Sequence, residues 1–371
     1  MRKHHPKNEI VKHRYLGWLE DAQGRDRKTG DMAAAALASF EASTGHKDFA
    51  AFHLEQARKF KRDLLDADHT KSGKALAKST VHSRLAAVRA FFNWLADQPG
   101  YKSKLHRSDF EYFSLSANDS RIAKASREGP FPSLDQVRRV VLSCPHETAL
   151  EKRDRALIAF GLLSGARIAA LASLQIRHVD LDGRSVFQDA RDVNTKNRKT
   201  FISHFFPMGE DLVSITAEWI VYLQSVEAFG PCDPLFPKTL HGQDANNRFV
   251  AAGLSREPWK RGNSIREIFR RRFEAAGVPY FNPHSLRKTI MQDGYRRRFS
   301  PEEEKAWSQN FGHDDTRTTR DSYGPVSVGR QAEILAQMAR NEQPVIVPTG
   351  DPPPEVIDWV QDHLRRLARS K

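Results

Sequence analysis

The spacing of apolar residues predicts helices through the first hundred positions of the chain. The clearest helix starts at a cap, Ser79 or Thr80, and its apolar residues follow at steps of four and three, which form one continuous helical stripe. That stripe consists of Val81, Leu85, Val88, Phe92 and Leu95. Three earlier amphipathic helices are predicted, the first around Tyr15 and Leu19, the second beginning at Gly30 and the third running from about Phe49.

The pattern then weakens and recovers in a second region. Residues 101–131 lack strong periodicity and end in polar and turn residues, which is typical of a linker at about 126–131. Ser133 caps a predicted helix to about Ser143, and a strongly apolar helix follows from about Thr148 to Gly165. Arg167 begins another helix directly after this break.

Alternating residues and turn signals predict a small antiparallel sheet of about three strands between residues 179 and 207. The polar run 194–199 forms the tip between two of these strands. Helices are predicted at 212–226 and 264–276, with a loop-rich insertion at 230–262 between them. The fold class expected is therefore mainly α with a small antiparallel β-sheet (α+β).

The C-terminal end is predicted to hold a helix at 327–340, a Pro-rich leash at 341–354 and an amphipathic helix at 355–369. The last helix has an apolar face, and it can pack on its own domain or dock on a neighbouring protein. The domain boundaries expected from these patterns are 1–125, 126–131, 132–340 and 341–371.

The charge narrows the class of partner. The 371 residues carry a formal net charge of +13 and the pI is about 9.8, which favours a polyanionic partner, most simply nucleic acid, over a generally basic soluble surface. The two cysteines, Cys144 and Cys232, have no metal-ligand spacing. No signal peptide, membrane span or ATP-binding phosphate loop is read, so we expect a cytoplasmic protein that uses no metal and no cofactor.

Two short segments hold the candidate chemistry: PHSLRKT, with His284 and Arg287, and FGHDDTRTTRDSYG, with His313 and Tyr323. Cationic side chains near a helix start favour a phosphate ligand, and a tyrosine beside them can act as nucleophile. Arg167 is either a surface cation or a ligand-binding one, and its spacing does not choose between these.

Outward-facing arginines are candidates for contact with a DNA backbone. In the helical region these are Arg84 and Arg89, and a second row is formed by Arg266, Arg270 and Arg271. A solvated helix face is the alternative for each of them taken singly.

Taken together, these motifs resemble the tyrosine recombinase (phage integrase) family. SGARIAALASL is similar to its first arginine box, TKNRK to its lysine hairpin, PHSLRKT to its HxxR box, and FGHDDTRTTRDSYG to its box with the tyrosine. The match covers about 131–340, and the helical region before it resembles the core-binding domain of the family. One departure is Ala170, where many members have Glu.

The resemblance implies a role for each site residue. Arg167 and Arg287 would stabilise the charge on a phosphodiester, and His313 would add a hydrogen bond. Tyr323 would be the nucleophile, with His284 as its base. Lys196, or alternatively Lys199, would protonate the leaving 5′ oxygen.

The resemblance also implies partners and a reaction. The partners would be double-stranded DNA recombination sites, other protomers in a homo-tetramer, and accessory DNA-bending or directionality proteins. The reaction would pass through a 3′-phosphotyrosyl intermediate without ATP or metal. Two alternatives stay open, a type IB topoisomerase and a catalytically inactive DNA-binding protein.

Overall fold

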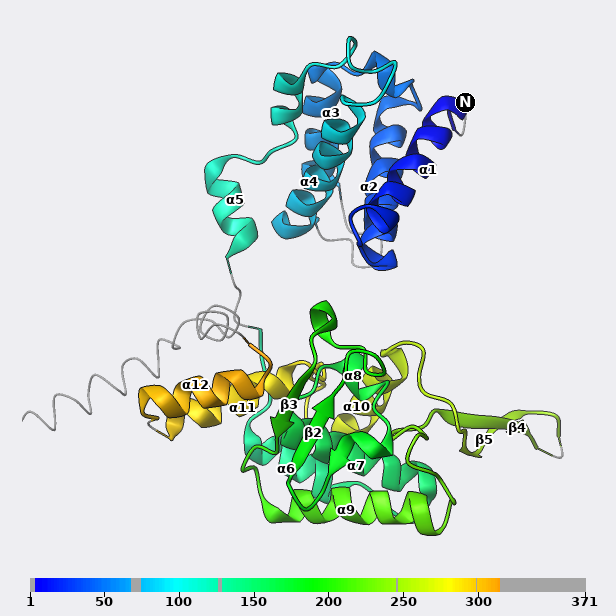
Figure 1. Cartoon of the computed structure of the whole chain (residues 1–371), viewed down its shortest axis with the longest axis vertical. Coiled ribbons are helices and arrows are strands. Elements are labelled where there is room, and N and C mark those ends of the chain that lie inside the picture. The colour runs from blue at the N-terminus through cyan, green and yellow to red at the C-terminus, as the bar shows by residue number, and fades with distance from the viewer. Residues whose placement is uncertain (1–3, 68–74, 126–128, 245, 298, 314–371) are drawn as a thin grey trace, which may run out of the picture. The chain divides into compact units, whose positions relative to one another are not determined.

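The computed structural model describes residues 4–67, 75–125, 129–244, 246–297 and 299–313. The chain divides into two compact units between residues 127 and 128, inside the segment for which the sequence predicts a linker (Figure 1). Several predicted features lie outside the described residues, namely Tyr323, the helix at 327–340, the Pro-rich leash and the helix at 355–369.

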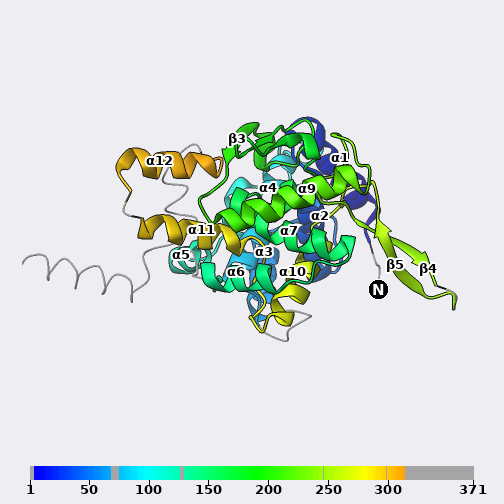
Figure 2. The same ribbon diagram turned by 90° about the horizontal axis from the view of Figure 1, so that it is seen from below.

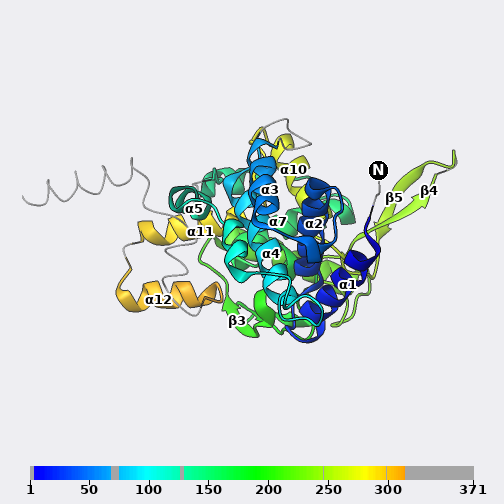
Figure 3. The same ribbon diagram turned by 90° about the horizontal axis from the view of Figure 1, so that it is seen from above.

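The first unit is helical, as the apolar spacing predicts. Its α-helices are α1 (Pro6–Asp21), α2 (Arg27–Thr44), α3 (Leu54–Asp66), α4 (Lys78–Leu95) and α5 (Ala117–Lys124). Two 3₁₀ helices, η1 (Phe49–Ala51) and η2 (Arg107–Tyr112), accompany them. The predicted stripe of α4 is at most 1% exposed and lies in the core of this unit, so the helical period is confirmed there. Helices α2, α3 and α4 pack side by side in this unit (Figures 1 and 3).

Three boundaries in this unit differ from the prediction. Helix α4 begins at Lys78 after Ala77, whose side chain makes no cap, so neither Ser79 nor Thr80 is the cap. Helix α2 begins earlier than Gly30, because the Asp26 carboxylate accepts a hydrogen bond from the backbone of Thr29 and caps the helix there. The helix predicted from Phe49 is interrupted, with a 3₁₀ turn before α3.

The second unit combines helices with two small sheets. Its helices are α6 (Leu134–Ser143), α7 (Ala149–Ser164), α8 (Ile168–Leu171), α9 (Glu210–Ser225), α10 (Asn263–Ala275), α11 (Ser285–Arg296) and α12 (Pro301–Asn310). Ser133 and Thr148 cap α6 and α7, each through a reciprocal capping box, as their positions before apolar runs predict. Helix α7 runs through the core, and eleven of its sixteen residues are buried.

The predicted sheet of three strands is confirmed. Strands β1 (Val179–Asp180), β2 (Ser185–Gln188) and β3 (Phe201–His204) pair antiparallel in that order. The 3₁₀ turn η3 (Ile176–His178) directly precedes β1, and the 3₁₀ turn η4 (Lys196–Arg198) is the tip between β2 and β3.

The prediction of a loop-rich insertion at 230–262 is wrong for its central part. Residues there form a second antiparallel pair, β4 (Thr239–Gln243) and β5 (Phe249–Leu254), with a register shift after Leu240. This hairpin projects from the helices of its unit (Figures 1 and 2). Its strands leave most residues exposed, so they lack the strict apolar alternation by which a strand is predicted.

A buried ion pair joins the root of this hairpin to the core. Arg153 and Asp154 on α7 are 2% and 1% exposed, and the Arg153 Nη2 to Asp154 Oδ1 distance is 2.8 Å. Arg153 also donates to Pro237 O and Thr239 Oγ1, while Arg272 of α10 donates to Asp154 Oδ2 at 3.0 Å. Each buried charge is thus compensated, which a low-dielectric interior requires.

Candidate active site

Arg167 lies where two helices meet. Helix α7 ends at Gly165, whose left-handed φ of 58° turns the chain, and Arg167 is the extended N-cap residue of α8. Ala170, the position at which many family members have Glu, is fully buried on α8 among apolar side chains. The side chain of Arg167 is half-buried, and its charge acts on both site histidines. The structure therefore brings the charge of Arg167 close to His284 and His313.

Arg287 is the fixed cation of the site. It lies in the first turn of α11 and is 2% exposed. Its guanidinium donates to Gly165 O and, at 3.2 Å, to Phe311 O, and it also lies over the Phe311 ring, 4.6 Å from the centroid. These bonds hold Arg287 against the turn that carries Arg167 and against the segment that carries His313.

His313 contacts Arg287 directly. The Arg287 Nη2 to His313 Nε2 distance is 3.2 Å, and a guanidinium can only donate, so Nε2 accepts and the proton is assigned to Nδ1. His313 is 6% exposed. Desolvation, followed by repulsion from Arg287, Arg167 and the lysines 196 and 199, lowers its pKa to about 4. At neutral pH this imidazole is therefore uncharged and carries its proton on Nδ1.

His284 is the N-cap residue of α11, directly before its first turn. The Asn282 side chain accepts a hydrogen bond from the His284 backbone at 3.1 Å and fixes the helix start. The pKa of His284 is lowered to about 4, first by desolvation and then by Arg287, Arg167 and two lysines, although the residue keeps an exposed surface. A neutral imidazole that water and substrate can reach is suited to accept a proton.

The lysine tip lies on the same side of the unit. Lys196 is exposed, and its charge contributes to the lowered pKa of both histidines. Lys199 is half-buried, its Nζ lies 3.4 Å from Gly312 O, and its charge contributes to the lowered pKa of His313. Both lysines thus belong to the positive surroundings of the histidines, and the amine of Lys199 also contacts the backbone at Gly312.

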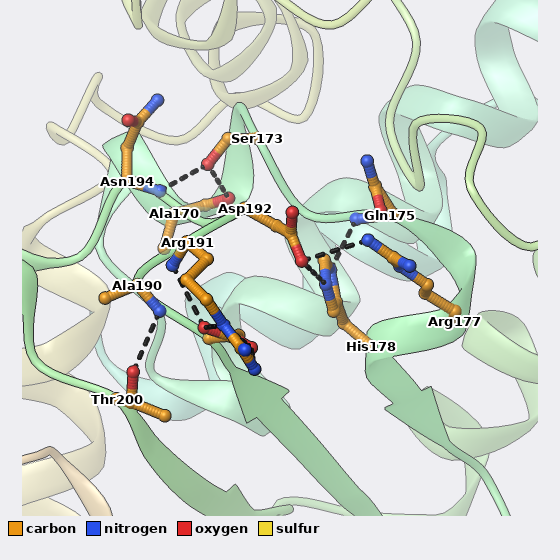
Figure 4. A network of polar contacts seen from close by, with 11 residues as sticks. Ala170, Ser173, Gln175, Arg177, His178, Ala190, Arg191, Asp192, Asn194 and Thr200 are labelled. Carbon is orange, nitrogen blue, oxygen red and sulfur yellow. Dashed lines mark hydrogen bonds and ion pairs between the residues drawn. The ribbon is translucent and has the colours of Figure 1, made fainter.

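Polar contacts fasten the root of this tip to the body (Figure 4). The Asn194 backbone donates to Ser173 Oγ at 2.8 Å, and the Ala190 backbone donates to Thr200 Oγ1 at 3.0 Å. Asp192 binds Arg177 at 2.9 Å. None of these contacts is predictable from the sequence, because single polar residues in turns carry no periodic signal.

The assembled residues form a site for an anion. The charges that most affect the two histidines are all positive, which is the environment that a phosphodiester and its transition state require. Lys288, which the sequence analysis did not select, is a further cation beside His284 and follows Arg287 in the chain. Among the described residues, no three His, Cys, Asp or Glu side chains cluster as metal ligands would.

The five candidate DNA-binding arginines do not form a row of exposed cations, because several of them are half-buried or already contact other side chains. Arg84 and Arg89 are half-buried on α4, and Arg89 is paired with Glu111. On α10, Arg266 donates to Asn263 at 2.8 Å. Arg270 lies over the Tyr280 ring, and Arg271 is 3.5 Å from Asp154. Binding a phosphate with Arg271 would therefore compete with an existing ion pair.

We expect Gly165→Ala to destabilise the second unit by about 1–3 kcal/mol. The left-handed φ of 58° disfavours a side chain, and an added Cβ would lie 2.9 Å from Phe311 Cε1 and 3.0 Å from Phe206 Cε2. Urea denaturation measures the effect. Gly277→Ala is the matched control, because its φ is 67° but no atom lies within 4 Å, so only the backbone cost applies. Equal losses in the two variants would contradict the packing argument.

We expect the stability of the protein to fall between pH 7 and pH 5 in part through His313. In this window an unfolded imidazole, with a pKa of about 6.5, gains a proton that the folded His313, with a pKa of about 4, does not. The contribution of His313 to the free energy of unfolding is thus fully present above the unfolded pKa. It is lost as the pH falls, by about 1–2 kcal/mol. Urea unfolding of wild type and His313→Gln at both pH values measures it, and parallel losses in both would exclude His313 as the cause.

No helix in the described part of the chain combines the length and the apolar character needed to cross a membrane.

Comparison with known proteins places this geometry in a family. The model of the phage integrase family matches residues 133–327. A tyrosine recombinase XerC of Salmonella typhi is 28% identical over 148 residues, 40% of this chain and 43% of that protein. A XerC of Escherichia coli O1:K1 / APEC is 27% identical over 187 residues, 49% of this chain and 55% of that protein. The chain therefore spans about half the length of the curated relatives it matches.

Solved structures share the fold. A lambda integrase dimer bound to a COC′ core site aligns with a TM-score of 0.55 and 12% identity, covering 86% of this chain and 99% of that one. The Tn1549 transposon integrase in complex with transposon right end DNA aligns with a TM-score of 0.56 and 14% identity, covering 89% and 99%. The family model matches more than half of the 371 residues of this chain, so the chain belongs to the phage integrase family.

Proposed function

We propose that this protein is a site-specific DNA recombinase that cleaves and rejoins DNA through a 3′-phosphotyrosyl intermediate. The observation that carries the proposal is the convergence of Arg167, Arg287, Lys196 and two neutral histidines from separate segments around one position. Strand exchange needs such a site, because a phosphodiester gains reactivity chiefly from cations that stabilise its developing charge.

The proposed cleavage step exchanges one phosphodiester for another. Tyr323 Oη attacks the phosphorus, a P–O bond to the tyrosine forms, and the bond to the 5′ oxygen breaks. His284 accepts the phenol proton, which its imidazole can do because it is neutral at pH 7. Arg167 and Arg287 bind the non-bridging oxygens, and His313 donates from Nδ1. Attack by a 5′ hydroxyl of a second strand reverses the step and releases Tyr323, so the bond energy is conserved.

Lys196 is the proposed general acid for the 5′ oxygen. It is exposed at the tip, and its charge reaches both histidines. Lys199 is the weaker candidate, since its amine already lies 3.4 Å from Gly312 O. A lysine at an exposed turn can approach the leaving group and give up one of its three protons.

The two units are proposed to bind DNA together. Arg84 and Arg89 of the helical unit and Arg266, Arg270 and Arg271 of the catalytic unit would contact the backbone, with the net charge of +13 supporting attraction to DNA. The proposed domains are 1–125, the linker 126–131, 132–340 and the C-terminal segment 341–371. The proposed assembly is a homo-tetramer on two recombination sites, with accessory DNA-bending or directionality proteins, in the bacterial cytoplasm.

The test is covalent trapping on a suicide DNA substrate, in which a nick lets the cleaved strand diffuse away and prevents rejoining. We expect a protein–DNA adduct to accumulate without ATP or metal. The substrates are built from the DNA that flanks the gene. Absence of the adduct on that DNA and on randomised libraries would favour an inactive DNA-binding protein.

A second assay separates the recombinase from a type IB topoisomerase. Wild-type protein is incubated with a supercoiled plasmid that carries two copies of the trapped site. We expect joined or deleted products that depend on both sites. Relaxation that proceeds equally well with one site, and without any joined product, would instead support topoisomerase activity.

A further inference from the structure

The loop between β2 and β3 has a fastened root and an exposed tip. The tip is η4, in which Lys196, Asn197 and Arg198 are exposed and the last two have positive φ angles of 58° and 51°. A rigid root below a small exposed turn restricts where a tip side chain can reach. The contacts of the root therefore bear on the position of Lys196.

The first fastening point is Asp192. Its Oδ2 lies 2.9 Å from Arg177 Nη2 and 3.6 Å from His178 Nε2, both from the turn before β1 (Figure 4). His178 is 4% exposed, and its Nδ1 accepts a hydrogen bond from the Gln175 backbone at 3.0 Å. A neutral imidazole that accepts at Nδ1 carries its proton on Nε2, so its N–H faces the Asp192 carboxylate.

The second fastening point is Ser173, directly after α8. Its Oγ accepts from the Asn194 backbone at 2.8 Å (Figure 4). Its hydroxyl donates to the carbonyl of Ala169 at 3.0 Å. The N-cap residue of α8 is Arg167. One short helix thus carries a catalytic arginine at its start and, just past its end, the hydroxyl that holds the loop two residues before Lys196.

Between these points the loop is fixed by its own backbone and by burial. Val193 is 2% exposed and belongs to the core of the unit, and its N–H donates to Asp189 O at 2.7 Å. Beyond Asn194, the Thr195 backbone N–H donates to Val193 O at 2.7 Å, and among the described residues its buried hydroxyl has no hydrogen-bond partner. The exposed residues Lys196, Asn197 and Arg198 follow directly.

We propose that Asp192 and Ser173 are positioning residues for the general acid, which set the reach of the Lys196 amine to the leaving 5′ oxygen by fixing the loop on which it stands. This inference rests on the proposed function. Neither residue would touch DNA. Loss of either contact leaves Lys196 in the chain but lets the tip move, and misplacement of a catalytic group by about 1 Å costs up to a hundredfold in rate.

The experiment compares two leaving groups in single-turnover cleavage by full-length protein. One substrate has the natural 5′ oxygen, and the other has sulfur at the same bridging position. A thiol ionises near pH 8.5, far below an alcohol, so the sulfur leaves as thiolate without needing the lysine proton. A defect in delivering that proton is thus repaired by sulfur, whereas a defect in folding or in phosphate binding is not.

We expect Asp192→Ala and Ser173→Ala to cleave the oxygen substrate about tenfold to a hundredfold more slowly than wild type. On the sulfur substrate both should come within about threefold of wild type, as should Lys196→Ala. Combining Ser173→Ala with Lys196→Ala should slow the oxygen reaction no further than Lys196→Ala alone, because the two changes remove one function.

Two variants serve as matched controls. Asp182→Ala removes an exposed carboxylate from the neighbouring turn, and Ser214→Ala removes a hydroxyl that donates to Glu210 O one turn earlier in α9. Both should cleave each substrate at the wild-type rate. Equal slowing of the Asp192 and Ser173 variants on both substrates would overturn the proposal, as would full activity on oxygen. Absence of covalent product from wild type on both substrates would instead overturn the proposed function itself.

Discussion

Tyr323→Phe is expected to abolish the covalent protein–DNA adduct while leaving DNA binding within about twofold of wild type. The substitution removes only the phenol oxygen, which is the proposed nucleophile, and keeps the ring. The site cations remain, so the phosphodiester should still be bound. Trapping on a suicide substrate, followed by denaturing electrophoresis, measures the adduct, and a mobility-shift titration measures binding. The expected drop in cleavage exceeds about 10⁴-fold, because without a nucleophile the step has no route.

The matched control is Tyr222→Phe. Tyr222 lies on α9, and its hydroxyl donates to Glu227 at 3.0 Å, so the variant removes a phenol oxygen with a structural partner. It should form the adduct at the wild-type rate. An adduct that persists in Tyr323→Phe would refute the nucleophile assignment. Mapping the modified peptide would then show which residue carries the DNA.

The helices and the first sheet were predictable because their burial is periodic. The stripe of α4 repeats at helical spacing, and burial alternates along β2 and β3. The hairpin of β4 and β5 was missed because it projects from its unit, so neither face is selected for burial. Phe249 illustrates this, since it is 78% exposed at a strand position. A strand without a buried face has no apolar period to detect.

The sequence predicted which residues supply the cations of the site, but it did not predict the contacts that those residues make. Short sequence motifs located Arg167, Arg287 and His313. The hydrogen bond from Arg287 to Gly165 O, however, joins positions 122 residues apart. No local spacing predicts such a bond. Nor could spacing separate Lys196 from Lys199, because that preference depends on how each amine lies relative to Gly312 and the histidines. For the same reason the sequence did not identify Ser173 and Asp192, whose proposed role depends only on the loop that they contact.

Arg287→Ala is expected to slow single-turnover cleavage by about 10³-fold or more. The guanidinium is the most buried of the site cations and is held by two backbone carbonyls and the Phe311 ring, so its position costs no reorganisation during the reaction. Arg287→Lys should recover only a small part of the rate. A lysine keeps the charge but cannot present the planar pair of donors that binds two phosphate oxygens.

The loss must be separated from unfolding, since Arg287→Ala leaves the carbonyls of Gly165 and Phe311 without their donor, at about 1–3 kcal/mol each if they stay buried. Thermal melting and DNA binding are therefore measured beside the rate, with Arg296→Ala, an exposed arginine of the same helix, as the control. A direct signature is the pKa of His313. Repulsion from Arg287 helps to lower it to about 4, so removal of that charge should raise it toward 6.5, which an imidazole NMR titration detects. A folded variant with an unchanged rate would remove Arg287 from the catalytic set, whereas a slow, folded variant with a raised His313 pKa would support Arg287 as a catalytic cation beside His313.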